Sequence, residues 1–404
     1  MSETFNNSGL RQYLVVTGNY WAFTLTDGAL RMLVVMHFYS LGYSPLAIAS
    51  LFLFYELFGV ITNLVGGWLG ARIGLNKTMH IGLLLQVVAL SMLLVPASML
   101  SVVWVMAAQA MSGIAKDLNK MSAKSSLKLL LPEDAQSALY QWVAILTGSK
   151  NALKGVGFFL GGLLLAQLGF QGAVGSMAAV LAAIWLSLFL LKKDLGKSKF
   201  KPKFKDLFSK SAAINQLSAA RLFLFGARDV WFVIALPLYL ATEFQWSQTS
   251  IGGFLALWVI GYGAVQALAP MLTGKQAGKV PGHHAVVGWA AALCAIPLFI
   301  SIGMAYSSSP LYVLIGGLML FGAVFAVNSS LHSFLIVSLA GRDGVSLDVG
   351  FYYMANAMGR LMGTVLSGWI YQRAGLDACL WLSSAFLLLT VLISLKSDQQ
   401  PSSI

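Results

Sequence analysis

Nine basic and four acidic side chains lie inside long apolar stretches of this 404-residue sequence. The basic residues are Arg31, Lys116, Lys120, Lys124, Lys150, Lys154, Arg221, Arg228 and Arg360, and the acidic residues are Asp27, Glu56, Asp117 and Asp229. A charge at the centre of a bilayer costs at least about 2.5–3.5 kcal/mol, so charges within spanning segments mark candidate functional sites. Buried cations without partners should not persist, so either several of the five excess bases are neutral or a ligand supplies the negative charge. The second alternative predicts an anionic ligand with more than one charged group.

Seven of these bases form the predicted substrate-binding set: Arg31, Lys116, Lys120, Lys150, Lys154, Arg228 and Arg360. Lys154 and Arg360 lead the set, because they occupy equivalent positions in two repeated halves of the chain, described below. A guanidinium binds phosphate or arsenate with a planar fork, whereas an ammonium acts as a point charge. Lys116, Lys120 and Lys124 lie at i, i+4 and i+8. We expect Lys116 or Lys120 to face the cavity and Lys124 to extend to the cytoplasmic interface.

The four acids are predicted to pair with these bases or to carry protons. Asp27 and Arg31 are four residues apart, so they either neutralise each other on one helix face or leave Arg31 for the substrate. Glu56 either carries a proton or forms a salt bridge with another helix. Arg228 with Asp229 is either a structural pair or part of the site.

Three further positions are assigned by their place in the sequence. Arg221 lies one or two turns from a basic linker and is expected at an entrance rather than at the centre. Asn328 and His332 are the polar groups of a span that carries no formal charge, and we expect them to line the cavity. His332 either titrates near neutrality or is a hydrogen-bonded packing residue.

The composition identifies the setting of these charges. The chain is 58% hydrophobic and 10% charged, with a mean hydropathy of +0.78, whereas soluble proteins have about 25% charged residues. This excludes a soluble enzyme, a disordered scaffold and a nucleic-acid binder, and indicates an integral membrane protein. Apolar runs of about 20 residues, without the alternation of a barrel strand, indicate helices. The polar N-terminus lacks the basic start of a signal peptide, so we expect the first helix to be retained.

The apolar runs predict an all-α protein of twelve transmembrane helices. The predicted spans are 12–39, 45–70, 78–97, 102–127, 136–167, 173–191, 213–241, 249–272, 285–305, 310–339, 347–373 and 377–395. Near the midpoint, residues 192–210 contain eight lysines. The sequence therefore predicts an N-terminal six-helix bundle (1–191), a basic cytoplasmic linker (192–212) and a C-terminal six-helix bundle (213–404).

The distribution of basic residues orients the chain. With the N-terminus in the cytoplasm, the inside connections carry Arg72, Lys77, Lys128, the linker lysines, Lys275, Lys279, Arg342 and Lys396. The outside connections carry only Arg373. By the positive-inside rule both termini are cytoplasmic. The lysine run is then a topology anchor on anionic lipid, and the net charge of +12 requires no nucleic-acid partner.

The two halves are related by a weak internal repeat. A shift of 202 residues places Asp27 on Asp229, and a shift of 206 places Lys154 on Arg360 and Gly157 on Gly363. This arrangement resembles the major facilitator superfamily, whose two six-helix halves are parallel repeats around a central cavity. The loop from Gly67 to Lys77 resembles the superfamily signature, but Ala71 stands where that signature has aspartate, so its charge-relay role is not expected here. In that superfamily every third helix faces lipid, and spans 3, 6, 9 and 12 have no charge away from their ends.

Several other activities are not supported. We expect no cofactor, no metal site and no catalytic residue: His283–His284 has no third ligand, no Walker motif occurs, and the acids are dispersed rather than clustered. Cys294 and Cys379 lie in apolar segments and indicate neither disulfides nor a thiolate site. An exporter of cationic drugs would need acids rather than nine buried bases, and a lipid carrier would need a more apolar cavity.

Four stretches are similar to one narrower family: residues 17–35, 112–128, 146–162 and 225–233. They resemble the ArsJ family of organoarsenical efflux permeases from bacterial arsenic-resistance operons. The resemblance implies export of 1-arseno-3-phosphoglycerate across the bacterial inner membrane, with a glyceraldehyde-3-phosphate dehydrogenase as the functional partner that makes this ester. The resemblance to the major facilitator superfamily implies a monomer in the lipid bilayer. Export of another organic phosphate anion is the alternative.

Overall fold

The computed structural model describes residues 7–43, 51–190, 195–199, 202–208, 210–273 and 281–396. Residues 192–194, 200, 201 and 209 of the predicted basic linker, together with Lys275 and Lys279, lie outside these residues. The described part is helical, because a helix satisfies its backbone hydrogen bonds within one segment and so can be embedded in an apolar medium.

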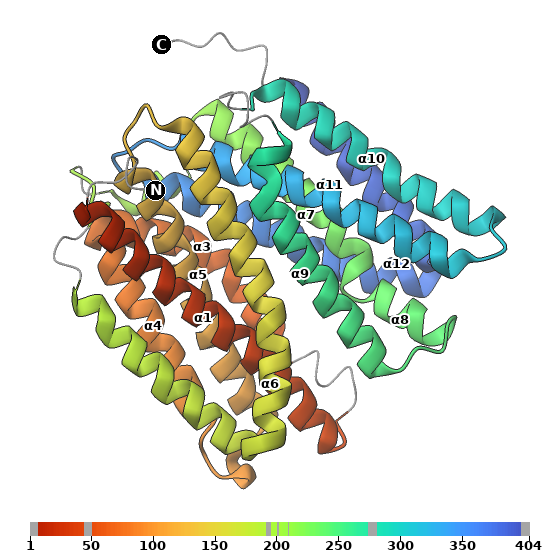
Figure 1. Cartoon of the computed structure of the whole chain (residues 1–404), viewed down its shortest axis with the longest axis horizontal. Helices are drawn as coiled ribbons and strands as arrows, with labels where there is room; N and C mark the ends of the chain where they lie inside the picture. The colour runs from red at the N-terminus through yellow and green to blue at the C-terminus, as the bar shows by residue number, and fades with distance from the viewer. Residues whose placement is uncertain are drawn as a thin grey trace. The chain divides into compact units, whose positions relative to one another are not determined.

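The long apolar runs form the helices labelled in Figure 1. In the N-terminal half these are α1 (Asn7–Ser40), α3 (Leu53–Ile73), α4 (Leu75–Met92), α5 (Val102–Leu130) and α6 (Gln136–Leu186). In the C-terminal half they are α7 (Ala212–Phe232), α8 (Ala235–Thr242), α9 (Gln248–Leu272), α10 (His283–Tyr306), α11 (Pro310–Leu339) and α12 (Val345–Lys396). Short 3₁₀ turns lie at Ala97–Met99, Ser187–Leu190 and Phe204–Leu207.

Two of these helices are each a pair of spans joined at a glycine. α6 breaks at Gly169 (φ 66°) and α12 breaks at Gly375 (φ 74°), in a backbone region that is essentially restricted to glycine. The two breaks are 206 residues apart, the same offset that superposes Lys154 on Arg360. α6 and α12 each contain two spans, whereas α7 and α8 together form one span. The described helices therefore account for the twelve predicted spans, and the predicted fold class is confirmed.

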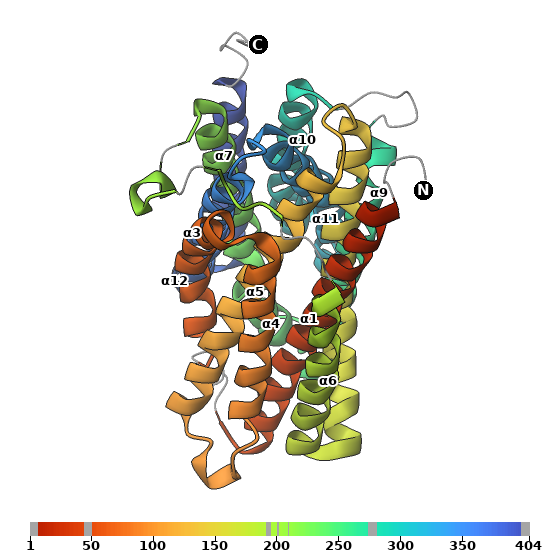
Figure 2. The same cartoon turned by 90° about the vertical axis from the view of Figure 1, so that its left-hand side faces the viewer.

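The chain divides into two compact units. Unit 1 contains Met1–Trp142, Ser149–Ser209 and Ala340–Met354, and unit 2 contains Val143–Gly148, Lys210–Leu339 and Ala355–Ile404. Within unit 1, α5 packs against α1, α3 and α4 (Figure 2), and within unit 2, α11 packs against α7, α9 and α10 (Figure 1). The fourth and tenth spans are therefore the central helices of their units, and these are the spans that carry Lys116–Lys124 and Asn328–His332.

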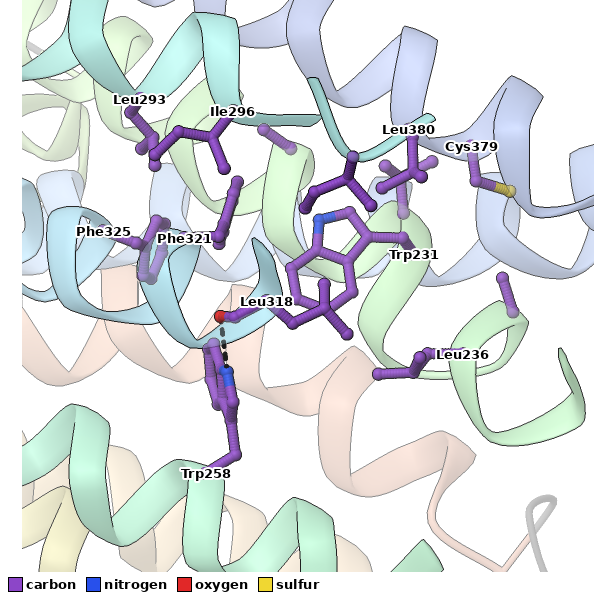
Figure 3. Close-up of a cluster of buried hydrophobic side chains, with 14 of the residues drawn as sticks. Trp231, Leu236, Trp258, Leu293, Ile296, Leu318, Phe321, Phe325, Cys379 and Leu380 are labelled. Carbon is purple, nitrogen blue, oxygen red and sulfur yellow. Dashed lines mark hydrogen bonds between the residues drawn. The ribbon is translucent and has the colours of Figure 1, made fainter. Parts of the chain in front are cut away.

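An aromatic cluster forms the core of unit 2. Trp231 of α7 is fully buried and packs edge-on against Phe321 of α11, with ring centroids 5.0 Å apart. Trp258 of α9 donates its indole N–H to the Leu318 carbonyl at 2.9 Å (Figure 3). Buried aromatic rings contribute large apolar areas, so this cluster packs α7 against α11, the helices that carry Arg221, Arg228, Asp229, Asn328 and His332.

Six of the described helices are long and apolar enough to cross a bilayer, judged by length and composition alone. Large apolar side chains such as Val103, Leu257, Phe299 and Val365 are exposed, and a water-facing surface would not carry so many of them. The chain is a multi-pass membrane protein.

Candidate functional site

Asp27 organises the charges of α1 in unit 1. The Tyr55 hydroxyl of α3 donates to both carboxylate oxygens of Asp27, at 2.8 and 3.0 Å. The Lys154 ammonium of α6 lies 3.8 Å from Asp27 Oδ2. Asp27 is 5% exposed, so these contacts from two other helices supply the polar partners that a buried carboxylate needs.

Arg31 pairs with another helix rather than with its own. Its Nη2 lies 3.2 Å from Glu56 Oε1 on α3, and its guanidinium lies over the Phe52 and Tyr55 rings at 5.1 and 5.0 Å. Of the two sequence-based alternatives for Asp27 and Arg31, the self-neutralising pair is therefore wrong. Glu56 forms the interhelical salt bridge that was one of its two predicted roles.

The lysines of α5 share one aspartate. Asp117 Oδ1 accepts a hydrogen bond from Lys120 at 2.6 Å, and its Oδ2 lies 3.8 Å from Lys116 Nζ. Lys116 also lies over the Tyr55 ring, 3.8 Å from its centroid. Asp117 is 1% exposed, and it holds two cations with a single negative charge, so this trio keeps one net positive charge.

Lys124 does not extend to the cytoplasmic interface, and that prediction is wrong. Its side chain is 2% exposed and donates to the hydroxyl of Tyr353, a residue of α12 that belongs to unit 1. The Tyr353 ring also lies under Lys120 and Lys124, at 4.6 and 4.7 Å. The hydroxyl and the ring of Tyr353 hold Lys124 in the protein interior rather than at the membrane interface, because the face of an aromatic ring attracts cations strongly where water is excluded.

Lys150 lies one helical turn before Lys154 on α6 and is half-buried. Both project from the first of the two spans in α6, the span that also packs against α1. Among the charged residues singled out from the predicted spans, the bases of this unit are Arg31, Lys116, Lys120, Lys124, Lys150 and Lys154, and they outnumber the acids Asp27, Glu56 and Asp117.

In unit 2 one aspartate again holds two bases. Asp229 Oδ1 accepts from Arg228 Nε at 2.6 Å, and its Oδ2 accepts from Arg360 Nε on α12 at 3.1 Å. Asp229 is fully buried, whereas the Arg360 side chain remains 28% exposed. Two guanidinium groups around one carboxylate leave one net positive charge, with Arg360 the more accessible of the two.

Arg221 is not an entrance group. It is 2% exposed, and it donates to Asn356 Oδ1 at 2.8 Å and to the Ser329 carbonyl at 3.1 Å. Its guanidinium also lies 3.9 Å from the centroid of the Phe225 ring. The sequence-based expectation used its distance from the linker, but α7 turns this side chain into the interior of unit 2.

Asn328 and His332 are both completely buried on α11. Asn328 donates to the carbonyls of Trp289 and Val324 at 2.9 and 3.0 Å. Among the described residues, neither imidazole nitrogen of His332 has a hydrogen-bond partner. His332 therefore differs from the hydrogen-bonded packing residue that was one of its two sequence-based interpretations. The assignment of both residues to a cavity wall stays a prediction.

The two units place equivalent ion pairs on equivalent helices. Asp27 with Lys154 joins the first and fifth spans, and Asp229 with Arg360 joins the seventh and eleventh. In both units glycines let these helices approach closely. A Cβ added at Gly157 would lie 3.0 Å from the Gly28 Cα, and one added at Gly363 would lie 2.7 Å from the Gly226 carbonyl oxygen. In each unit the internal repeat therefore places an equivalent salt bridge on an equivalent pair of helices, which pack closely at glycines.

We expect Gly28→Ala to destabilise unit 1. An added Cβ would lie 2.6 Å from the Lys154 carbonyl oxygen, which belongs to a helix backbone and cannot rotate away, so α1 and α6 must separate. Overpacking of this kind costs about 1–3 kcal/mol. Gly18→Ala on the same helix is the matched control, because nothing lies within 4 Å of its added Cβ. Thermal unfolding in detergent should show a lower midpoint for Gly28→Ala only; equal midpoints would contradict the close packing.

Ala71, which replaces the aspartate of the loop signature, is a packing residue. It is fully buried with Leu207 and Leu347 in a small apolar cluster, and its carbonyl accepts from the Ser198 amide at 2.8 Å. Within the described ranges, no group of three or more His, Cys, Asp or Glu side chains could hold a metal ion. The chemistry that these residues support is the binding of charged groups.

Sequence reasoning missed three aromatic residues that join the charges. Tyr55 contacts Asp27, Arg31 and Lys116, Tyr353 contacts two lysines, and Phe225 lies beside Arg221 and Arg228. The signal available for Tyr55 was its position next to Glu56. Tyr353 had no such signal, because its partners are more than 200 residues away.

The family comparison agrees with this architecture. The profile of the Major Facilitator Superfamily matches residues 14–234 and 217–403. No curated protein matches the chain.

Three solved structures share the fold over nearly their whole length. The human organic anion transporter MFSD10 (TETRAN) has a TM-score of 0.73 at 20% identity, and the alignment covers 95% of this chain and 97% of that one. A bacterial homologue of the iron transporter ferroportin in an outward-facing state has a TM-score of 0.72 at 15% identity, with 95% and 100% covered. The E. coli fucose:proton symporter FucP has a TM-score of 0.73 at 14% identity, with 98% and 100% covered.

Proposed function

The chain belongs to the major facilitator superfamily, and from this premise we propose that it exports a phosphorylated organic anion by alternating access. Members of this superfamily carry small molecules across membranes as secondary transporters, and nothing in the described residues indicates catalysis. The proposed cargo is 1-arseno-3-phosphoglycerate, whose exit would give resistance to arsenate. We place the protein in the bacterial inner membrane as a monomer with both termini in the cytoplasm.

The observation that carries this proposal is that each unit contains a buried aspartate that holds two bases, so that one positive charge in each unit is not neutralised. In unit 1, Asp117 holds Lys116 and Lys120, and in unit 2, Asp229 holds Arg228 and Arg360. Each trio keeps one net positive charge in a setting where isolated charges are costly. An anion with more than one charged group would supply the negative charge that these bases lack, and a phosphate and an arsenate on one three-carbon chain have this property.

The membrane potential supplies a physical reason for the direction of transport. An inside-negative potential favours exit of an anion by about 2.3 kcal/mol per charge per 100 mV. A multiply charged anion therefore needs no coupled proton. The cytoplasmic dehydrogenase would supply the ester continuously, and breakdown of the ester outside would prevent its return.

Glu56→Gln tests whether a proton is coupled to transport. Because Glu56 is held by Arg31 at 3.2 Å, we expect it to act as a salt-bridge partner rather than as a proton carrier. The variant should export at a moderately reduced rate and should respond to an imposed pH gradient as the wild type does. Loss of a pH-gradient response that the wild type shows would assign the proton to Glu56 and contradict this reading.

The alternative cargo is another organic phosphate anion, and the same charges suit it. Expression in arsenate-sensitive cells separates the two. Resistance that appears only when the chain and a glyceraldehyde-3-phosphate dehydrogenase are expressed together supports the arsenic ester. Sensitivity that is unchanged by both proteins, at verified membrane levels, would leave the alternative.

A further inference from the structure

Unit 1 contains a cavity that is not part of the buried charge network. It has a volume of about 250 Å³ and lies where α5 ends and α6 begins, closed on one side by the connection between α11 and α12. A water molecule occupies about 30 Å³, so the cavity has room for a small organic anion. Lys128 marks this end of unit 1 as the side predicted to be cytoplasmic.

The polar side chains of the cavity are two bases, one amide and one acid: Lys128, Arg342, Gln136 and Glu133. Lys128 lies in the last turn of α5. Arg342 belongs to the connection that precedes α12, and its Nη2 donates to the Leu131 carbonyl at 3.0 Å. The Leu131 carbonyl thereby holds the Arg342 guanidinium at the cavity wall.

The acid of this cavity is held loosely. Arg342 Nη1 lies 3.0 Å from Glu133 Oε1, but the Glu133 side chain is 76% exposed. Exposed ion pairs contribute little to stability, so an incoming oxyanion can take the place of Glu133 beside Arg342 at low cost. Guanidinium forks bind phosphate with two parallel hydrogen bonds, and Lys128 would add a second positive charge on the same cavity.

We propose that this cavity is a second anion site, which binds a phosphate group between Lys128 and Arg342 on the cytoplasmic face of unit 1. The site goes beyond the proposed transport function and does not depend on the cargo. The phosphate group comes either from a soluble phosphorylated anion or from the headgroup of an anionic lipid. Because Arg342 also holds the Leu131 carbonyl, occupancy would act on the link between the α11–α12 connection and the end of α5.

Chemical footprinting of lysines in the detergent-solubilised full chain tests the site. An amine-reactive reagent is applied with increasing inorganic phosphate at constant ionic strength, and the modification of Lys128 is followed by mass spectrometry. Lys77, an exposed lysine of α4, is the internal reference. At about nine times the dissociation constant, ~90% occupancy should reduce the rate at Lys128 about tenfold by mass action, with Lys77 unchanged.

Two variants, and nanodiscs with or without phosphatidylglycerol, complete the test. Arg342→Ala should lose the protection of Lys128, whereas Lys77→Ala should retain it. In nanodiscs, protection by phosphatidylglycerol without added phosphate identifies a lipid headgroup as the source, and protection only by added phosphate identifies a soluble anion. Modification of Lys128 that is independent of phosphate and of lipid charge, or equal protection in Arg342→Ala, would overturn the proposal.

Discussion

Arg360→Ala is expected to abolish export while the protein still reaches the membrane. Arg360 Nε lies 3.1 Å from Asp229 Oδ2, and its side chain is 28% exposed, so it can contact both its carboxylate and a substrate. Without Arg360, Asp229 and Arg228 neutralise each other, and the trio loses its net positive charge. A hydrogen bond to a charged group contributes about 1.5–3 kcal/mol, which corresponds to roughly a 10- to 150-fold loss of affinity.

Lys154→Ala should have the same effect from the other unit, because Lys154 is the repeat equivalent of Arg360 and lies 3.8 Å from Asp27. Arg360→Lys is the matched control: it keeps the charge and loses the planar fork, so partial export should remain. The measurement is the initial rate of export, normalised to the amount of protein in the membrane. Normal export by both alanine variants would show that these cations do not bind the cargo.

A reversible cross-link between α3 and the start of α12 is expected to stop transport. A Cβ added at Gly70 would lie 3.1 Å from the Cβ of Ser346, and disulfides need about 3.5–4.5 Å between Cβ atoms, so Gly70→Cys with Ser346→Cys can form one after a small shift. Ser346 already donates to the Gly67 carbonyl at 2.8 Å. Alternating access requires the helices to rearrange, and a covalent link would remove one of the two states.

The cross-link experiment has internal controls. Oxidation should lower the export rate at least about tenfold, because a trapped protein cannot shift its population, and reduction should restore it. Each single cysteine variant should be insensitive to oxidation, since the native Cys294 is only partly accessible and Cys379 is buried. Full activity of the oxidised double variant would mean that Val345–Met354 stays on unit 1 throughout the transport cycle.

The sequence was sufficient to predict the fold and the equivalent positions of Lys154 and Arg360 in the two halves. The uninterrupted apolar runs were sufficient to predict the number of spans. They also separated the two spans that meet at Gly169 and the two that meet at Gly375. The offset that aligns Lys154 with Arg360 also predicted that the two side chains have equivalent roles, and the structure pairs each with an aspartate of the equivalent helix.

The partners of individual charges could not be predicted in the same way. Arg31 forms its salt bridge with Glu56 instead of Asp27, and Lys124 is buried and donates a hydrogen bond to the Tyr353 hydroxyl. Spacing along one helix predicts which residues share a face of that helix. The rotation of the helix relative to its neighbours determines which residues that face contacts. Arg221 was misplaced for this reason, since its interior partners come from α11 and α12.

Uptake by everted membrane vesicles shows whether the protein exports the organoarsenical ester. Vesicles that contain the protein receive radiolabelled arsenate, with or without glyceraldehyde-3-phosphate, NAD and the dehydrogenase. We predict accumulation of label only with the complete mixture, and none with Arg360→Ala vesicles. Accumulation of arsenate alone, or no accumulation with the complete mixture, would contradict export of the organoarsenical ester.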